Sequence, residues 1–282
     1  LRWDGSAWTI VSRPPISPRA LAMVATDDGW IVGSGAANKP GSILRWDGAT
    51  WAEATNPTDQ GLYDVAMLSA TDGWIVGNKG AILHWDGSEW RPYPSPTTAR
   101  LFAVTVSRQD GWIVGDGGVI LHWDGAQWLL VPSPTGEILR DVASGADGSA
   151  WAVGVWGIVL QWDGATWMSI PRSGRDYLNG VVSDLNGGAW VVGNGDTILH
   201  GKGNAWTPLS RPPRPNFEAV TMASESLGMA VGYSGEIYHW NGIRWTAMKS
   251  PTGARLLGID LLTPDDGWAV GTDGQILRWD GS

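Results

Sequence analysis

The sequence of 282 residues predicts an all-β protein, a seven-bladed β-propeller of four-stranded antiparallel blades. The first observation is a repeat, since W-D-G or a relative of it recurs at intervals of 43, 39, 38, 39, 39, 39 and 39 residues. A second string, close to G-W-[IAV]-V-G, ends at Gly33, Gly77, Gly115, Gly154, Gly193, Gly232 and Gly271. Seven repeats of about 40 residues, each with room for four short strands, are typical of propeller blades.

The composition agrees with this fold class and excludes several others. Asp outnumbers Glu by 22 to 6, and Asp favours turns whereas Glu favours helices. With 43% hydrophobic and 17% charged residues, the chain can build a core and is not a disordered protein. The absence of Cys excludes a disulfide scaffold, Cys-ligated zinc and thiol catalysis. No apolar run approaches the ~20 residues that span a bilayer, and a net charge of −9 argues against nucleic-acid binding.

Each repeat is predicted to hold four strands, as its second copy illustrates. The expected strands cover residues 62–68, 74–77, 81–85 and a fourth from 88 through 90. The first strand carries an apolar pair spaced by three, which occurs in the seven copies as Leu21/Val24, Leu62/Val65, Leu101/Val104, Leu139/Val142, Leu178/Val181, Phe217/Val220 and Leu256/Ile259.

The third and fourth strands are joined by Asp-Gly or Asn-Gly, a pair that favours a two-residue type I′ turn. In the second copy, this turn is 86–87. The resulting register places Trp85 opposite Ser88 and Leu83 opposite Trp90. The Asp is then explained by backbone conformation alone.

The two ends of the chain predict a closed ring within a single domain, residues 1–282. Residues 275–279 read as the third strand of the last repeat, whose fourth strand is absent. Residues 1–10 are expected to complete the blade formed by 253–282. Such closure removes the free sheet edges that an open ring exposes.

The segment G-W-I-V-G-N-K-G-A-I-L-H-W-D-G-S-E-W, Gly73 to Trp90, resembles the repeat of the photosystem II stability/assembly factor family, within the sialidase-like, Asp-box propellers. The resemblance covers the chain in seven copies and departs from the family pattern at the hairpin, where one Gly follows the Asp and a Trp usually precedes it. It implies a non-catalytic, extracytoplasmic assembly protein that binds a protein or peptide segment. We therefore expect an extracytoplasmic or secreted bacterial monomer without a cofactor.

In a propeller, the loops from strand four to one and from strand two to three gather on one face, which in this chain is rich in Arg. Arg holds carboxylates bidentately and is enriched at interface centres, so we expect a protein segment to bind this Arg-bearing face. The alternative is a scatter of solvated charges. Trp156 belongs to neither repeated Trp position and is either a recognition aromatic or a packing plug. The candidate binding residues are Arg19, Arg100, Arg140, Arg175, Arg214, Arg255, Trp156, Tyr233 and Lys79.

The opposite face, formed by the hairpin turns, is expected to be acidic. It receives the W-D-G turns and the carboxylates before strand two, namely Asp28, Asp72, Asp110, Asp147 and Asp266. These residues form either a cation-binding rim or ordinary turns, and turn chemistry favours Asp in either case.

The repeated Trp residues leave a carbohydrate-binding propeller as the alternative function. The Trp residues of strand two read as packing between blades. Hairpin residues such as Trp46 and Trp85 either pack in the core or at its edge, or are exposed enough to stack on sugars. The four His residues occupy one repeat position on strand three and read as framework, which predicts no metal site. No nucleophile elbow, phosphate loop or zinc spacing is present, so the sequence predicts no enzyme.

Overall fold

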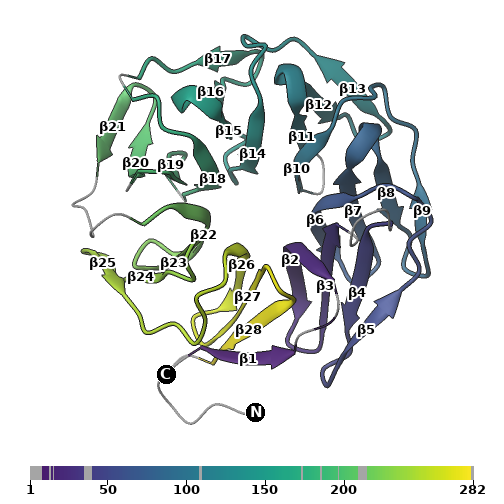
Figure 1. The fold of residues 1–282 in the computed structure, drawn as a ribbon. Helices are drawn as coiled ribbons and strands as arrows, with labels where there is room; N and C mark the ends of the chain where they lie inside the picture. The colour runs from purple at the N-terminus through teal and green to yellow at the C-terminus, as the bar shows by residue number, and fades with distance from the viewer. Residues whose placement is uncertain are drawn as a thin grey trace.

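The computed structural model is a ring of seven four-stranded antiparallel sheets around a central axis, which confirms the predicted seven-bladed propeller (Figure 1). It describes residues 8–12, 14, 16–34, 40–107, 110–172, 174–184, 186–195, 197–208 and 215–280. Within these residues, no helix is long and apolar enough to cross a membrane.

The first four blades follow the chain in order. Blade one consists of β2 (Ser17–Ala25), β3 (Asp28–Ser34), β4 (Ser42–Trp46) and β5 (Trp51–Ala54). Blade two consists of β6 (Leu62–Ser69), β7 (Asp72–Gly77), β8 (Ile82–Trp85) and β9 (Trp90–Pro92). Blade three consists of β10 (Leu101–Val106), β11 (Gly111–Gly115), β12 (Ile120–Trp123) and β13 (Trp128–Val131). Blade four consists of β14 (Leu139–Ser144), β15 (Ala150–Gly154), β16 (Val159–Trp162) and β17 (Trp167–Ser169).

The remaining blades repeat this order. Blade five consists of β18 (Leu178–Ser183), β19 (Ala189–Gly193), β20 (Ile198–Lys202) and β21 (Ala205–Pro208). Blade six consists of β22 (Phe217–Ser224), β23 (Leu227–Gly232), β24 (Ile237–Trp240) and β25 (Trp245–Ala247). Blade seven consists of β26 (Leu256–Thr263), β27 (Asp266–Gly271), β28 (Gln275–Trp279) and β1 (Thr9–Ser12).

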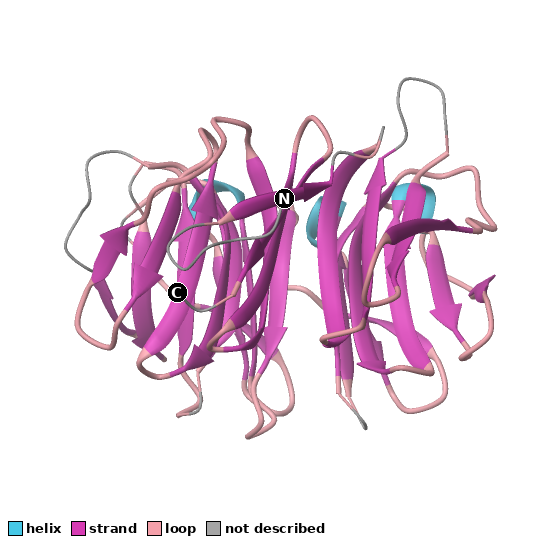
Figure 2. Cartoon of the chain, turned by 90° about the horizontal axis from the view of Figure 1, so that it is seen from below, coloured by secondary structure: helices cyan, strands magenta, loops and turns pink. Residues whose placement is uncertain are grey.

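The first strand of every blade is innermost and lines the axis, and the fourth is outermost (Figure 1). The turns from strand two to strand three include three short 3-10 turns, η1 (Asn78–Gly80), η2 (Asp116–Gly118) and η3 (Val155–Gly157). Figure 2 shows these turns at one end of the strands, with the hairpin turns at the other. The two loop faces expected from the sequence, one with the strand-two to strand-three turns and one with the hairpin turns, are therefore present.

The N-terminal strand closes the ring, as predicted. β1 pairs antiparallel with β28, with Thr9 opposite Arg278 and Ile10 opposite Leu277. Trp8, just before β1, is 1% exposed and packs with the apolar residues of blades six and seven. The sequence places this strand at Ser6 to Ile10, whereas the observed strand is Thr9–Ser12, and residues 1–7 lie outside the described part.

The predicted hairpin register was wrong. Trp85 lies opposite Trp90, so the connection is a four-residue loop, 86–89. The Oδ1 atom of Asp86 accepts the main-chain N–H groups of Ser88 (2.9 Å) and Glu89 (3.0 Å). A type I′ turn needs positive φ at both turn residues, but only Gly87 (φ +89°) has it. The Asp side chain thus stabilises a loop longer than the predicted turn. The same register is found in other blades, where Trp46 lies opposite Trp51 and Trp123 lies opposite Trp128.

The apolar pair spaced by three is explained by a β-bulge. In blade two, the register shifts between Leu62 and Asp64, so that Leu62 and Val65 are both buried. In a regular strand, residues three apart point to opposite faces of the sheet. The bulge adds one residue, so the two apolar side chains point to the same face. In blade one, the predicted pair was wrong, because Pro18 lies opposite Gly33 where Leu62 lies opposite Gly77. Leu21 therefore takes the second place of the pair.

The core consists of apolar clusters between neighbouring blades. Each cluster joins residues of two adjacent blades, for example Trp30 and Val32 of blade one with Leu62 and Trp85 of blade two. The Trp residues of strand two pack between blades as predicted, and Met229 takes this place in blade six at 0% exposure. Indole burial on this scale is a large part of the apolar stabilisation of the ring.

Candidate functional site

Seven bulge residues, one from each blade, ring the opening of the central channel. The register shift occurs at the same place in every innermost strand. The residue inside each bulge leaves the regular ladder and points away from the inter-blade core. These residues are Arg19, Tyr63, Phe102, Arg140, Asn179, Glu218 and Leu257, and all of them line the same cavity.

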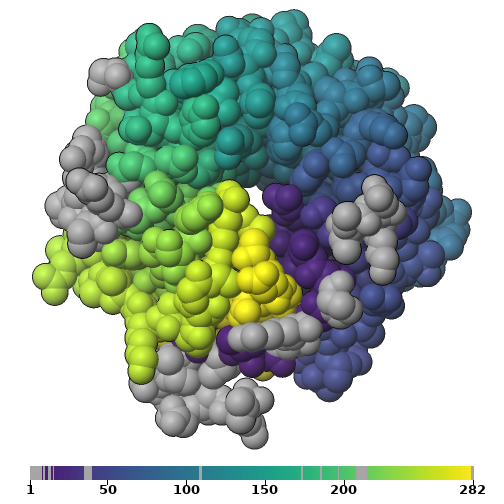
Figure 3. Space-filling view, viewed as in Figure 1, coloured from purple at the N-terminus to yellow at the C-terminus, as the bar shows by residue number. Residues whose placement is uncertain are grey.

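The cavity at this opening, called here the channel mouth, has a volume of about 370 Å³. Arg100, Ile138 and Arg255, which precede the bulges in the chain, complete its wall. A narrower space of about 200 Å³ continues below it between the innermost strands. Figure 3 shows the opening at the centre of the ring.

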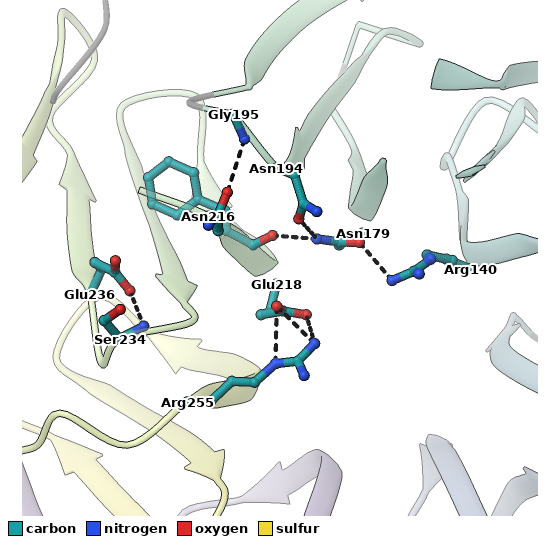
Figure 4. Close-up of polar contacts among 10 residues, drawn as sticks. Arg140, Asn179, Asn194, Gly195, Asn216, Glu218, Ser234, Glu236 and Arg255 are labelled. Carbon is teal, nitrogen blue, oxygen red and sulfur yellow. Dashed lines mark hydrogen bonds and ion pairs between the residues drawn. The ribbon is translucent and has the colours of Figure 1, made fainter. Parts of the chain in front are cut away.

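Two Arg residues at the mouth are paired with carboxylates of the chain itself. Arg255 donates from Nε and Nη2 to the two carboxylate oxygens of Glu218, at 3.0 and 2.9 Å (Figure 4). Arg100 donates from Nε to Oδ2 of Asp116 at 2.6 Å, and this contact raises the pKa of Arg100. Each of these Arg residues therefore contributes less positive charge to the channel mouth than the sequence indicated.

Arg140 belongs to a network of neutral groups. Its Nη1 donates to Oδ1 of Asn179 at 2.9 Å. The amide nitrogen of Asn179 donates in turn to Oδ1 of Asn194 and to the main-chain oxygen of Phe217, both at 2.8 Å (Figure 4). These hydrogen bonds hold the guanidinium of Arg140 at a fixed place in the mouth without pairing it to a carboxylate.

Aromatic rings support the guanidinium groups. Arg19 lies over Tyr63 at 5.6 Å, and Arg100 lies over Phe102 at the same distance. Arg140 lies 5.2 Å from the ring of Tyr177, and Arg255 lies 5.1 Å from that of Tyr233. Each contact holds a cation over a π-face and restricts its motion.

Trp156 is exposed on the same face. It is 54% exposed, with its ring edge-to-face with Tyr177 at 5.2 Å. Its φ of +59° is a left-handed conformation that costs a non-Gly residue free energy. Lys79 occupies the matching turn position in blade two with φ of +51°, and it is also exposed.

The structure gathers only part of the predicted set at the mouth. Arg19, Arg100, Arg140 and Arg255 line it. Tyr233 stands beside it at 55% exposure, under the guanidinium of Arg255. Trp156, Lys79 and the exposed Arg175 lie on loops outside the lining, and Arg214 lies outside the described residues.

Sequence reasoning missed the ring itself. Tyr63, Phe102, Asn179, Glu218 and Leu257 share a repeat position with Arg19 and Arg140, but their residue types have nothing in common. The signal that could have found them was the spacing of three, since an apolar pair so spaced in a strand requires a bulge. The residue that follows the first apolar residue of each pair is then the one that belongs to the ring at the channel mouth.

Two carboxyl groups lie below the mouth. Asp64 and Asp141 line the channel, and burial raises their pKa values to about 8 and about 7. The Oδ2 atom of Asp64 accepts the main-chain N–H of Val104 (2.8 Å), and that of Asp141 accepts the N–H of Val181 (2.7 Å). Each carboxyl thereby joins two blades across the bulge.

The acidic residues on the hairpin-turn face are largely paired. Asp72 and Asp110 contact Nε2 of His84 (2.8 Å) and of His122 (2.6 Å). Asp28 and Asp266 accept hydrogen bonds from the Nε atoms of Arg45 (3.1 Å) and Arg278 (3.2 Å). Among the described residues, no group of three or more His, Cys, Asp or Glu side chains is placed to hold a metal ion.

A family model matches part of the chain. Residues 44–132, within blades one to three, match the model described as photosynthesis system II assembly factor YCF48. A search among curated proteins finds no match.

Solved structures share the fold over the whole chain. A structure of YCF48 bound to D1 peptide matches with a TM-score of 0.82 at 19% identity, covering 99% of each chain. YCF48 from Cyanidioschyzon merolae matches with a TM-score of 0.77 at 18% identity, covering 98% of this chain and 99% of the other. A catalytically inactive virginiamycin B lyase from Staphylococcus aureus with quinupristin reaches 0.85 at 14% identity, covering 97% and 98%. The chain is thus similar to the photosystem II assembly factors: the family model matches residues 44–132, and the shared fold extends around the whole ring.

Proposed function

We propose that the protein is a non-catalytic binding module whose single propeller domain takes a protein segment at the channel mouth on its Arg-bearing face. The observation that carries this proposal is the ring of seven bulge residues, which presents the cations Arg19 and Arg140 among aromatic and amide side chains. Such a wall offers charge-assisted hydrogen bonds to carboxylates and flat surfaces to apolar side chains.

The comparisons support a peptide as the ligand. The neighbouring YCF48 structure is described as bound to D1 peptide, and its fold matches this chain over almost its full length. The lyase neighbour has the same fold, so the fold by itself does not decide between binding and catalysis. Our proposal of a non-catalytic module rests on the resemblance to the assembly factors, as does the proposal of an extracytoplasmic location.

The burial of the hairpin Trp residues also favours a protein segment over a carbohydrate. Trp46 and Trp85 are 4% and 5% exposed, and each indole packs against the strand-two Trp of the preceding blade. Stacking on a sugar needs a free indole face, which these residues do not offer. Among the described Trp residues, Trp156 at the proposed face is the one with a large exposed surface.

The test uses Arg19, which contacts no carboxylate among the described residues. Substitution of Arg100 or Arg255 also leaves its carboxylate, Asp116 or Glu218, without its ion-pair partner. A change in affinity could then come from local rearrangement and not from a lost contact with the peptide. We expect Arg19→Gln to weaken binding of the D1 peptide at least about fivefold, since a hydrogen bond to a charged group contributes roughly 1.5–3 kcal/mol. Fluorescence anisotropy with labelled peptide measures the affinity.

The matched control is Arg244→Gln, because Arg244 is an exposed Arg on a hairpin turn of the opposite face. A panel of peptides of graded acidity extends the test if the D1 peptide does not bind. Equal losses for both Arg variants contradict the proposed face. A glycan array hit lost on substitution of a hairpin Trp contradicts the proposed ligand class.

A further inference from the structure

A second cavity lies between blades five and six, on the hairpin-turn face and away from the channel mouth. It has a volume of about 360 Å³. Its lining includes residues of the strand-one to strand-two turns of both blades, which belong to that face. The residues that define this cavity, called here the inter-blade pocket, are Asp184, Trp190, His200, Met222, Glu225 and Trp240.

The matching place between blades one and two is filled by an Arg of the chain itself. Trp30 and Trp85 pack there with ring centroids 4.7 Å apart and planes at 58°. The guanidinium of Arg45 lies 5.1 Å from the first ring and 5.6 Å from the second. Its Nε donates to Asp28 at 3.1 Å, which completes a cation site of two indoles and a carboxylate.

The interface between blades seven and one repeats this arrangement. Arg278 lies 5.2 Å from the ring of Trp268, and its Nε donates to Asp266 at 3.2 Å. Arg45 and Arg278 occupy the same register position, opposite the Trp of strand two. At these two interfaces the fold accepts a guanidinium beside the carboxylate of the adjoining turn, whereas blades two and three have a His at this position.

Blades five and six keep the indole pair and the carboxylate but lack the Arg. Trp190 and Trp240 are 4.8 Å apart with planes at 60°, close to the geometry of Trp30 and Trp85. The residue opposite Trp190 is His200, whose ring stacks on the indole at 4.3 Å and whose Nε2 contacts Asp184 at 2.8 Å. Imidazole is shorter than an Arg side chain, so it does not reach as far toward the pocket.

The inter-blade pocket also contains an additional carboxylate. Glu225 follows the end of β22, and its main-chain oxygen accepts the indole N–H of Trp240, as that of Ala70 accepts the N–H of Trp85. Glu225 therefore occupies the position that Ala70 has at the interface of blades one and two. Its Oε1 accepts a hydrogen bond from Asn186 at 2.7 Å. Among the described residues, two carboxylates and no Lys or Arg line the pocket, and Lys202 outside the lining donates from Nζ to the main-chain oxygen of Asn186 at 2.5 Å.

The apolar part of the pocket is unsuited to a sugar. Trp190 and Trp240 are 4% and 7% exposed, and one face of Trp190 is covered by His200. Stacking on a sugar ring needs a bare indole face. Indole edges, the Met222 side chain and two carboxylates instead suit a cation at the end of an aliphatic stem.

We propose that the inter-blade pocket binds an organic cation, a guanidinium or primary ammonium on an aliphatic stem, which the chain itself supplies at two other interfaces. The cation lies between the carboxylates of Asp184 and Glu225, and the stem lies against Met222 and the indole edges. The ligand comes either as a free small molecule or as an Arg or Lys side chain of a partner.

The probe is n-butylguanidinium, and its neutral isostere n-butylurea is the paired control. Titration followed by NMR of the indole N–H signals, with calorimetry, is expected to give a dissociation constant of about 0.1–10 mM for the cation, as small ligands allow. The indole signal of Trp240 should shift most. Equal binding of n-butylurea overturns the proposal, because the carboxylates then contribute nothing.

Two variants locate the site. His200→Arg places the chain's own guanidinium in the pocket, as in the first interface, and should abolish binding while the melting temperature is kept. Glu225→Gln should weaken binding at least about fivefold, whereas Glu89→Gln, a change at an exposed carboxylate on another hairpin, should not. Unchanged affinity in His200→Arg overturns the site.

The source of the cation follows from a second titration. Nα-acetyl-arginine amide is compared with the same Arg inside a pentapeptide. Binding of both indicates a partner side chain, binding of the amide alone indicates a free small molecule, and binding of neither overturns the assignment to an Arg side chain. Arg19→Gln should leave all these affinities unchanged, which separates this pocket from the proposed peptide site.

Discussion

Trp112 of blade three and Trp162 of blade four pack with ring centroids 4.8 Å apart, and Trp112 has no exposed surface. The same contact recurs between most neighbouring blades, with the strand-two Trp of one blade against the hairpin Trp of the next. The ring is therefore stabilised by a repeated pair of indoles at its inter-blade interfaces.

The first prediction concerns this pair. Trp112→Ala removes a fully buried indole and leaves a cavity, so the free energy of unfolding should fall by about 3–5 kcal/mol. Trp156→Ala removes an indole that is 54% exposed and should change it by no more than about 0.5 kcal/mol. Urea denaturation measures both, and equal losses would falsify the assignment of Trp112 to the core and Trp156 to the surface.

The second prediction concerns the hairpin loop. Asp86 accepts two main-chain N–H groups and the hydroxyl of Ser88, and these hydrogen bonds lower its pKa. Asp86→Asn should preserve the loop, because Asn241 accepts the same two kinds of N–H group in blade six. Asp86→Ala should lower the melting temperature further than Asp86→Asn does. If the two variants melt together, the side chain does not determine the loop.

The third prediction concerns closure of the ring. A chain without residues 1–12 lacks β1 and the buried Trp8, so blade seven is left with an unpaired edge. Its melting temperature should fall by more than about 5 °C. A synthetic peptide of residues 1–12 should restore much of the loss, whereas a peptide of scrambled order should not. An unchanged melting curve would show that the ring closes without β1.

The fourth prediction concerns pH. The pKa values of Asp64 and Asp141 are raised to about 8 and about 7, against about 3.9 in an unfolded chain. The folded protein therefore holds protons that the unfolded chain releases, and the free energy of unfolding falls as pH rises from about 4 to 8. Thermal melts between pH 5 and 8.5 should show this decline. The double variant Asp64→Asn, Asp141→Asn should be less stable but have a flatter slope, and an equal slope contradicts the assignment.

Much of the architecture was predictable because it repeats. One copy of the repeat determines four strands, and seven copies determine the ring, so errors in single elements did not change the fold. The hairpin register was wrong because Asp86 acts through its side chain, whereas the prediction considered only its backbone conformation. The bulge was missed because the residue inside it has a different type in each blade. The sequence shows it only through the spacing of three between the apolar residues of strand one.

The candidate site was less predictable because charges find partners in three dimensions. Arg100 and Arg255 were identified as binding residues, yet each meets a carboxylate of the chain, Asp116 or Glu218. Asp116 lies 16 residues from its partner and Glu218 lies 37 residues away, in the preceding blade. No local pattern shows such a pair, whereas Arg19 and Arg140 were found together only because the bulge places them at one opening.

The bulge ring gives the propeller seven side-chain positions, one from each blade, around a single opening. The residues inside the bulges lie outside the buried apolar clusters between blades, so replacing one alters the channel mouth and leaves that core intact. Arg19, Tyr63 and Glu218 illustrate how different such residues already are on one framework. Gene duplication could therefore diversify this protein's ligand one blade at a time, and a library randomised at the seven positions could select new ligands on an unchanged scaffold.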